Sequence, residues 1–120
     1  MKILIADDDT IFLTLVRDIL AEGGDEVLAA ENGREAWELL DANGADVAVL
    51  DINMPELDGG ELLRRIRADE RFAGLPVLLL ATGFAADDLV QENDPAITGF
   101  LPKPFEVGEL LQRVAQMTGR

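Results

Sequence analysis

Four of the short apolar runs in the sequence are followed by side chains that can do chemistry. These side chains are Asp7, Asp8 and Asp9 after the first run, Asp51 after the third, Thr82 after the fourth and Lys103 after the fifth. Carboxylates that share a site repel one another by about 4 kcal/mol at a separation of about 4 Å and an effective dielectric constant near 20. A proton, the Lys103 ammonium or a divalent cation could offset this repulsion.

The composition restricts which cation that would be. The chain contains no cysteine and no histidine, and carboxylate oxygens without these ligands favour Mg²⁺, Mn²⁺ or Ca²⁺. A few carboxylates completed by water are typical of Mg²⁺. A carboxylate beside a metal ion and a lysine can also attack phosphorus and form an acyl phosphate, provided that charge on the phosphoryl oxygens is neutralised. The sequence therefore favours a Mg²⁺ site, with Mn²⁺ as an alternative ion, that could take up a phosphoryl group.

The placement of these residues depends on an alternation of strands and helices. Short apolar runs typical of strands covered on both faces are Ile3–Ala6, Val27–Ala30, Val47–Leu50, Val77–Ala81 and Phe100–Leu101. Helical apolar stripes between and after them are Phe12, Leu15, Val16 and Ile19; Trp37 and Leu40; Leu62 or Leu63 with Ile66; and Val107, Leu110, Leu111 and Val114. The alternation predicts a parallel sheet with helices on both faces. All the chemically active residues then lie at one edge, where open α/β sheets bind ligands.

Length and charge limit the classes of function. The chain has 120 residues, which predicts a single domain over 1–120. Its net charge of −14 argues against direct binding to nucleic acid or to an anionic membrane. The apolar start is too short for a signal peptide, and no apolar stretch reaches membrane-spanning length, so we expect a cytoplasmic protein.

Each active residue has a simpler interpretation when it is taken alone. Asp9 before an apolar stripe suits a helix N-cap, and Asp51 suits the start of a turn. Thr82 could be a strand-end hydroxyl, Lys103 a turn lysine and Phe100 a core residue. Their common position at one sheet edge favours a site instead.

The motifs ILIADDD, VLDINMPELDG, LLLATG and GFLPKPF occur in this order along the chain. With them the chain resembles, from end to end, the receiver domain of two-component response regulators, including the chemotaxis receivers. The resemblance implies a flavodoxin-like α/β fold: a doubly wound, five-stranded parallel sheet of order 2-1-3-4-5 with five helices. It implies a phosphorelay signalling domain rather than an enzyme, which takes a phosphoryl group from a phosphohistidine of a sensor histidine kinase or a histidine phosphotransfer protein. A monomer or weak dimer is expected, and the downstream target or output domain stays open.

The resemblance also implies roles for individual residues. Asp51 is the phosphoacceptor. Mg²⁺ is held by Asp8, Asp51 and the backbone carbonyl of Asn53 directly, and by Asp7 through water. Lys103 and Thr82 bind the phosphoryl group, Thr82 and Phe100 switch the face made by helix four, strand five and helix five, and Asn53 and Phe84 tune hydrolysis. The Lys103–Pro104 bond is expected to be cis.

One segment departs from the family pattern. Pro95 stops helix continuation, so we expect a short fourth helix that ends near Asn93.

Two other functions stay open. A non-catalytic pseudo-receiver would lack Mg²⁺ binding. A phosphatase of the haloacid dehalogenase type would use Asp7 rather than Asp51 as its nucleophile.

Overall fold

The chain folds around a five-stranded parallel sheet, and a computed structural model describes residues 1–81 and 97–119. The strands are β1 (Lys2–Ala6), β2 (Glu26–Ala30), β3 (Val47–Asp51), β4 (Val77–Ala81) and β5 (Thr98–Pro102). The described helices are α1 (Thr10–Glu22), α2 (Gly33–Asn43), α3 (Gly59–Ala68) and α5 (Val107–Thr118). The sheet order is β2-β1-β3-β4-β5 with every pair parallel, which confirms the predicted flavodoxin-like topology. The fourth helix predicted to end near Asn93 falls on 82–96, outside the described residues.

The strands are slightly longer than the apolar runs that predict them. β4 has the predicted bounds, whereas β1, β2, β3 and β5 each extend by at least one residue. Asp51 is the last residue of β3 and pairs with Leu80 of β4, rather than following the strand. The added residues are mostly polar, because the backbone pairing continues past the point at which the side chains stop being apolar.

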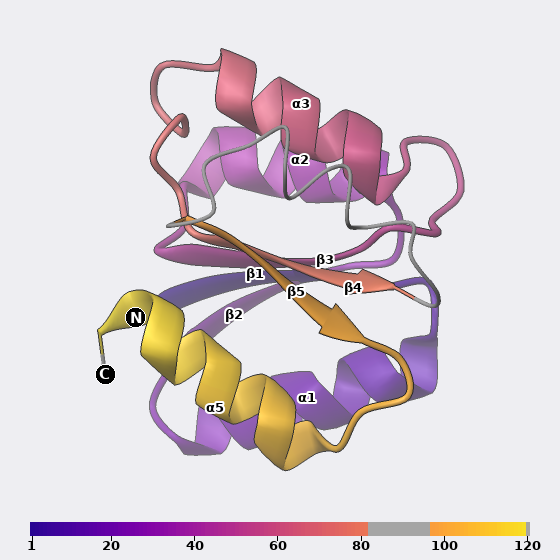
Figure 1. The fold of residues 1–120 in the computed structure, drawn as a ribbon, viewed down its shortest axis with the longest axis vertical. Coiled ribbons are helices and arrows are strands. Elements are labelled where there is room, and N and C mark those ends of the chain that lie inside the picture. Colours follow the sequence, from indigo (N-terminus) through magenta and orange to yellow (C-terminus); the bar gives the residue numbers. More distant parts are fainter. Residues whose placement is uncertain (82–96, 120) are drawn as a thin grey trace.

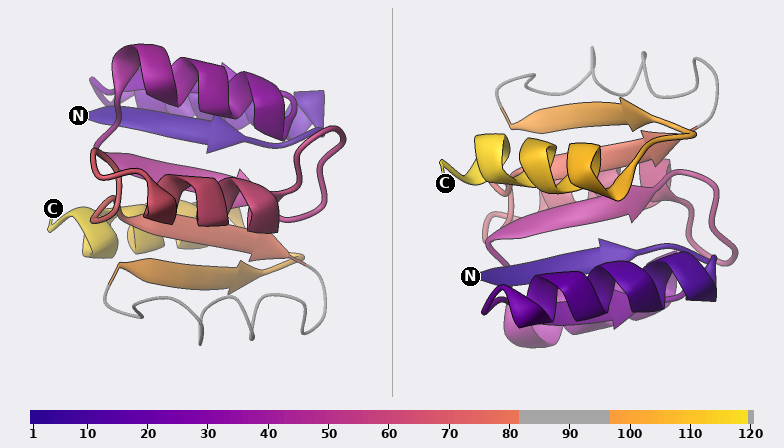
Figure 2. Two further views of the ribbon diagram at one scale, coloured as in Figure 1. Left: turned by 90° about the horizontal axis from the view of Figure 1, so that it is seen from above. Right: turned by 90° about the horizontal axis from the view of Figure 1, so that it is seen from below.

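The helices form two layers, one on each face of the sheet (Figure 1). α2 and α3 cover one face, and α1 and α5 cover the other, as views from above and below also show (Figure 2). The first layer packs on Leu4, Ala48, Leu50 and Leu79, and the second packs on Ile3, Ile5, Val49 and Leu78. Because both faces are covered, the central strands carry apolar residues without alternation.

The buried face of α1 differs from the predicted one. The spacing predicts a stripe of Phe12, Leu15, Val16 and Ile19, but the buried residues are Leu13, Val16 and Leu20. Leu15 is 49% exposed. Apolar residues occur almost all round this helix, so their spacing permits more than one orientation, and contact with the sheet selects one. None of the helices within the described part of the chain is long and apolar enough to cross a membrane.

Three of the helices begin with an N-cap side chain close to the carboxyl edge of the sheet. Asp9 accepts hydrogen bonds from the N–H groups of Ile11 and Phe12, each at 3.1 Å, which confirms its predicted role as the N-cap of α1. Asn32 and Asp58 cap α2 and α3 in the same way. These caps fix where each helix leaves the edge that carries the candidate site.

Two glycines allow the loop after β3 to fold back onto its neighbours. A Cβ on Gly59 would lie 2.5 Å from the carbonyl oxygen of Asp51, and a Cβ on Gly33 would overlap the carbonyl of Leu57. The Gly59 N–H also donates to the carbonyl of Ile52 at 2.9 Å. The loop therefore stays against the end of β3 and the start of α2.

The same loop contains a residue in the left-handed backbone conformation, which a glycine would adopt with less strain. Among the described residues, Glu56 is the one non-glycine residue with a positive φ, 67°. Its exposed side chain pairs with Arg34, with 3.3 Å between Nε and Oε2. We expect Glu56→Gly to be more stable than Glu56→Ala by about 1 kcal/mol in urea unfolding, because both variants lose the ion pair and only glycine relieves the left-handed conformation.

A helical position provides the control for this comparison. Glu38 is exposed within α2, where Gly should be less stable than Ala by about 1 kcal/mol. Equal stabilities of the two Glu56 variants would contradict the expected strain.

Candidate functional site

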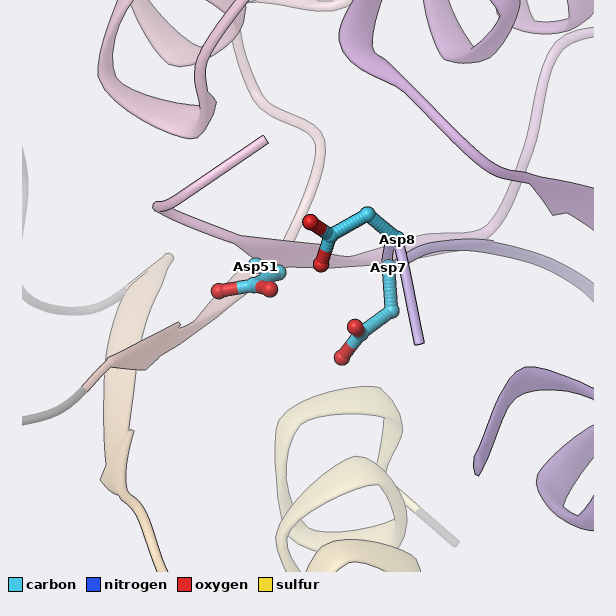
Figure 3. A group of neighbouring side chains, drawn as sticks. All are labelled: Asp7, Asp8 and Asp51. Atoms are coloured by element: carbon cyan, nitrogen blue, oxygen red, sulfur yellow. The ribbon is translucent and has the colours of Figure 1, made fainter. Parts of the chain in front are cut away.

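Three carboxylates meet at the carboxyl edge of the sheet. Oxygens of Asp7, Asp8 and Asp51 all lie within 4.8 Å of one another. Figure 3 shows them around a common space, with Asp7 and Asp8 from the end of β1 and Asp51 from the neighbouring β3. Asp7 is 1% and Asp51 2% exposed, whereas Asp8 is exposed. The structure thus brings together the three acids that the sequence places at this edge.

Local turns hold the two buried carboxylates in place. The Asp9 N–H donates to Asp7 Oδ1 at 2.9 Å, and the Asn53 N–H donates to Asp51 Oδ1 at 3.2 Å. Asn53 itself is exposed in the loop after β3. Each buried acid therefore has one oxygen engaged by a backbone amide two residues later, and the Oδ2 atoms of both acids face a different partner.

That partner is Lys103, which follows β5. Its Nζ lies 3.2 Å from Asp51 Oδ2 and 3.5 Å from Asp7 Oδ2. Its backbone N–H donates to the carbonyl of Ala81 at 2.7 Å, which continues the pairing of β5 with β4. The Lys103–Pro104 peptide bond is cis, the isomer that the resemblance implies. One ammonium thus bridges two buried carboxylates that reach the site from two different strand ends.

The buried acids and the lysine shift one another's pKa values. Burial, together with the charge of Asp51, raises the pKa of Asp7 to about 6, against the lowering effects of the Asp9 N–H and of Lys103. Burial acts to lower the pKa of Lys103, but the charges of Asp7 and Asp51 and their hydrogen bonds outweigh it, so the pKa is raised. The site therefore keeps its ammonium charged and disfavours a charge on Asp7.

The donor set fits a hard divalent cation. If Asp7, Asp8 and Asp51 are all ionised, Lys103 offsets one of their three charges. Burial and, after it, the charge of Asp51 raise the pKa of Asp7. Carboxylate oxygens are the ligands that Mg²⁺, Mn²⁺ and Ca²⁺ take in proteins. A cation among these oxygens would relieve the repulsion that the protein's own side chains leave.

The other predicted residues lie around this site or outside the described part of the chain. The Phe100 ring is partly buried against the core cluster on the α2 and α3 side of the sheet. Its carbonyl accepts a hydrogen bond from Arg113 Nη1 of α5 at 3.0 Å. Thr82 and Phe84 fall within 82–96, outside the described residues.

An aromatic contact that the sequence does not predict lies beside the lysine. The rings of Phe12 and Phe105 meet edge to face, with centroids 5.6 Å apart and planes at 75°. A pocket of about 390 Å³ lies between them and Lys103. The spacing of apolar residues places Phe12 in the core stripe of its helix, and no local pattern in the sequence pairs it with Phe105.

Comparison with known proteins assigns the chain to a family. Residues 3–115 match the response regulator receiver domain, and the chain belongs to this family. Chemotaxis protein CheY1 of Helicobacter pylori is 35% identical over 122 residues, which cover 99% of this chain and 98% of that protein. The chain is thus similar to the chemotaxis receivers along its length.

Solved structures agree with this assignment. Chemotaxis response regulator CheY4 of Vibrio cholerae matches with a TM-score of 0.84 and 30% identity, covering 97% of each chain. The receiver domain of sensor histidine kinase PA1611 from Pseudomonas aeruginosa matches with a TM-score of 0.78 and 26% identity, covering 99% of this chain and 98% of that one. The PA1611 structure has a magnesium ion coordinated in its active-site cleft.

The raised pKa of Asp7 predicts how stability depends on pH in the metal-free protein. The stabilisation contributed by protonated Asp7 is fully present below its unfolded pKa of 3.8 and is lost as the pH rises through about 6. Asp7→Asn cannot ionise, so we expect it to be more stable than the parent at neutral pH by up to about 3 kcal/mol. Below pH 3.8 the two proteins should have similar stability. Urea unfolding with a chelator, repeated across this pH range, measures the difference.

Asp8→Asn is the matched control for this prediction. It also removes one negative charge from the cluster, but Asp8 is exposed, so its gain at neutral pH should be smaller. A gain for Asp7→Asn that does not change with pH would show that ionisation of Asp7 is not its cause.

Proposed function

We propose that this receiver domain accepts a phosphoryl group on Asp51, in a Mg²⁺-dependent transfer from a phosphohistidine of a sensor histidine kinase or histidine phosphotransfer protein. The observation that carries the proposal is the setting of Asp51. Its carboxylate is 2% exposed at the end of β3, with one oxygen 3.2 Å from Lys103 Nζ and with Asp7 and Asp8 beside it. A lone structural acid would not need an ammonium and two further carboxylates around it.

The residues that would hold Mg²⁺ are Asp8, Asp51 and the backbone carbonyl of Asn53 directly, and Asp7 through water. Mn²⁺ would serve in its place. When bound, the ion neutralises negative charge on the transferring phosphoryl oxygens. The magnesium ion in the active-site cleft of the related PA1611 receiver domain supports this assignment.

The transfer exchanges one phosphorus bond for another. A carboxylate oxygen of Asp51 attacks phosphorus, the new O–P bond forms as the N–P bond to the imidazole breaks, and the imidazole nitrogen keeps the electron pair. Lys103 Nζ already lies beside an Asp51 oxygen, and it donates to a phosphoryl oxygen as negative charge develops there. These 120 residues contain no histidine, so the donor histidine lies outside them.

The phosphoryl group then acts as a signal. Thr82 and Lys103 bind it, and Phe100 changes its packing on β5, which alters the face that carries β5 and α5. Asn53 and Phe84 tune its hydrolysis. The domain thus promotes its own phosphorylation and dephosphorylation, and it works as a signalling domain rather than an enzyme with a separate substrate.

Phosphorylation by a small donor tests the proposed chemistry. With Mg²⁺ and acetyl phosphate, we expect the intact mass of the parent to rise by one phosphoryl group, because Asp51 and its partners need no protein donor for this step. Asp51→Asn should show no rise, and chelation of Mg²⁺ should abolish it in the parent. Intact-mass spectrometry and mapping of the modified peptide measure both effects.

Two other results would overturn this function in different ways. A phosphoryl group mapped to Asp7 would indicate a phosphatase-type nucleophile. A parent that neither gains mass nor is stabilised by Mg²⁺ would indicate a pseudo-receiver.

An apolar patch on α1 supports a protein as the donor. Ile11 is 83% and Leu15 49% exposed, and they are the exposed large apolar side chains among the described residues. They lie one turn apart and line a groove of about 470 Å³ on the helix that begins at the acidic site. We propose that this patch contacts the partner domain that presents the phosphohistidine.

Separate assays of protein and small donors test the patch. We expect the double variant Ile11→Ala, Leu15→Ala to lose at least about tenfold in phosphotransfer from a histidine kinase that phosphorylates the parent, because apolar contact area is lost. Phosphorylation by acetyl phosphate should be unchanged, since both side chains are exposed on α1 and Asp51 does not line their groove. Glu38→Ala, on a helix of the opposite layer, is the surface control. Equal losses with both donors would mean that the substitutions damage the site itself.

A further inference from the structure

The pocket beside Lys103 is bordered by a ring of contacts. It has a volume of about 390 Å³ and lies between the first turn of α1 and the segment that joins β5 to α5. Asp7, Asp9 and Phe12 line it from one side, and Lys103 and Phe105 line it from the other. The lysine that would contact the phosphoryl group therefore has a pocket, and not close-packed side chains, along one side.

Successive contacts close this ring. Asp7 Oδ1 accepts from the Asp9 N–H at 2.9 Å, and Asp9 Oδ1 accepts from the Phe12 N–H at 3.1 Å. The Phe12 ring meets the Phe105 ring edge to face at 5.6 Å. Lys103, two residues before Phe105, returns to Asp7 through the 3.5 Å contact of Nζ with Oδ2. The aromatic pair is the link that ties residues 103–106, the lysine segment, to α1.

Each end of the lysine segment has its own anchor. The Lys103 N–H is bonded to the Ala81 carbonyl at 2.7 Å, and the Glu106 N–H donates to Glu109 Oε1 of α5 at 3.4 Å. Between these anchors, Phe105 packs in the core cluster on the α1 and α5 side of the sheet. The direction in which Lys103 projects therefore depends on where the Phe105 ring rests.

The charges of the acids also hold Lys103, but this hold weakens when the acids engage another cation. Asp7 and Asp51 attract the ammonium at 3.5 and 3.2 Å. A divalent ion shared by the same carboxylates competes for that attraction. The aromatic contact involves no charge, so it persists when the site is loaded.

We propose that Phe12 is a positioning residue for phosphoryl transfer: its ring holds Phe105, and through it the Lys103 segment, where the ammonium reaches a phosphoryl group on Asp51. This inference rests on the proposed phosphoacceptor function. The Phe12 side chain acts through Lys103 and not by its own contact with the phosphoryl group.

Phe12→Leu tests the proposal while it keeps an apolar side chain at the position. With Mg²⁺ and acetyl phosphate, we expect phosphorylation to be about three- to tenfold slower, the range that loss of one edge-to-face pair accounts for. The affinity for Mg²⁺ alone, measured by titration, should be unchanged. Phe72→Leu is the matched control. Phe72, in the segment that follows α3, makes an edge-to-face pair with Trp37 of α2, with centroids 6.2 Å apart and planes at 88°. Equal rates for Phe12→Leu and the parent would overturn the proposal, and so would an equal loss in Phe72→Leu.

A second pair of variants separates positioning from general stability. In a Lys103→Met background, Phe12→Leu should cause no further loss of rate, because the group that it positions is absent. The same fold-loss in both backgrounds would mean that Phe12 acts by another route.

A measurement on the metal-free protein distinguishes failure of this inference from failure of the proposed function. ¹³C relaxation should show more motion of the Lys103 side chain in Phe12→Leu than in the parent, with no such change in Phe72→Leu. If the parent is not phosphorylated, the proposed function fails, and this relaxation result still decides whether Phe12 holds Lys103. Unchanged motion of Lys103 would overturn the inference even if the parent is phosphorylated.

Discussion

The repulsion between Asp7 and Asp51 is the constraint on which the rest of the structure depends. Both carboxylates are almost completely buried, and one ammonium lies 3.5 and 3.2 Å from them. Two like charges about 4 Å apart repel by about 4 kcal/mol at an effective dielectric constant near 20. The strands that carry these acids are stabilised by apolar side chains on both faces of the sheet. This burial allows the fold to hold a charged cluster that destabilises it.

The backbone prevents the acids from relieving their repulsion by moving apart. Asp7 and Asp51 each accept a hydrogen bond from the amide two residues later. The loop after Asp51 is held against the strand end by the hydrogen bond from the Gly59 N–H to the Ile52 carbonyl at 2.9 Å, an approach that a Cβ on Gly59 would prevent. Relief must therefore come from a proton or a cation. Because the two carboxylates are held in place and their repulsion is not fully offset, the site responds to the binding of a proton or a cation.

The sequence predicts the parts of this site that follow from strand ends. Val77–Ala81 is found as a strand with the predicted bounds, and the acids lie at the predicted edge because parallel strands end together. The orientation of α1 could not be predicted, since apolar residues occur almost all round it and only the sheet distinguishes Leu13 from its neighbours. The contact between Phe12 and Phe105 was also missed. It joins residues far apart in sequence, and no local pattern indicates which aromatic ring meets which.

The attachments of β5 restrict how a change at the site can spread. At the amino end of the strand, Arg67 of α3 donates to Thr98 Oγ1 at 2.9 Å, and Thr98 is 1% exposed. In its middle, Arg113 of α5 donates to the Phe100 carbonyl at 3.0 Å. Helices from both layers therefore hold the amino end and the middle of the strand, and sliding the whole strand would break both contacts. A shift that begins at Lys103 is then confined to the carboxyl end of β5, to the partly buried Phe100 ring and to the segment that leads into α5. The effect of a new charge on the carboxyl edge should consequently appear on the face that carries β5 and α5, and not in the central strands.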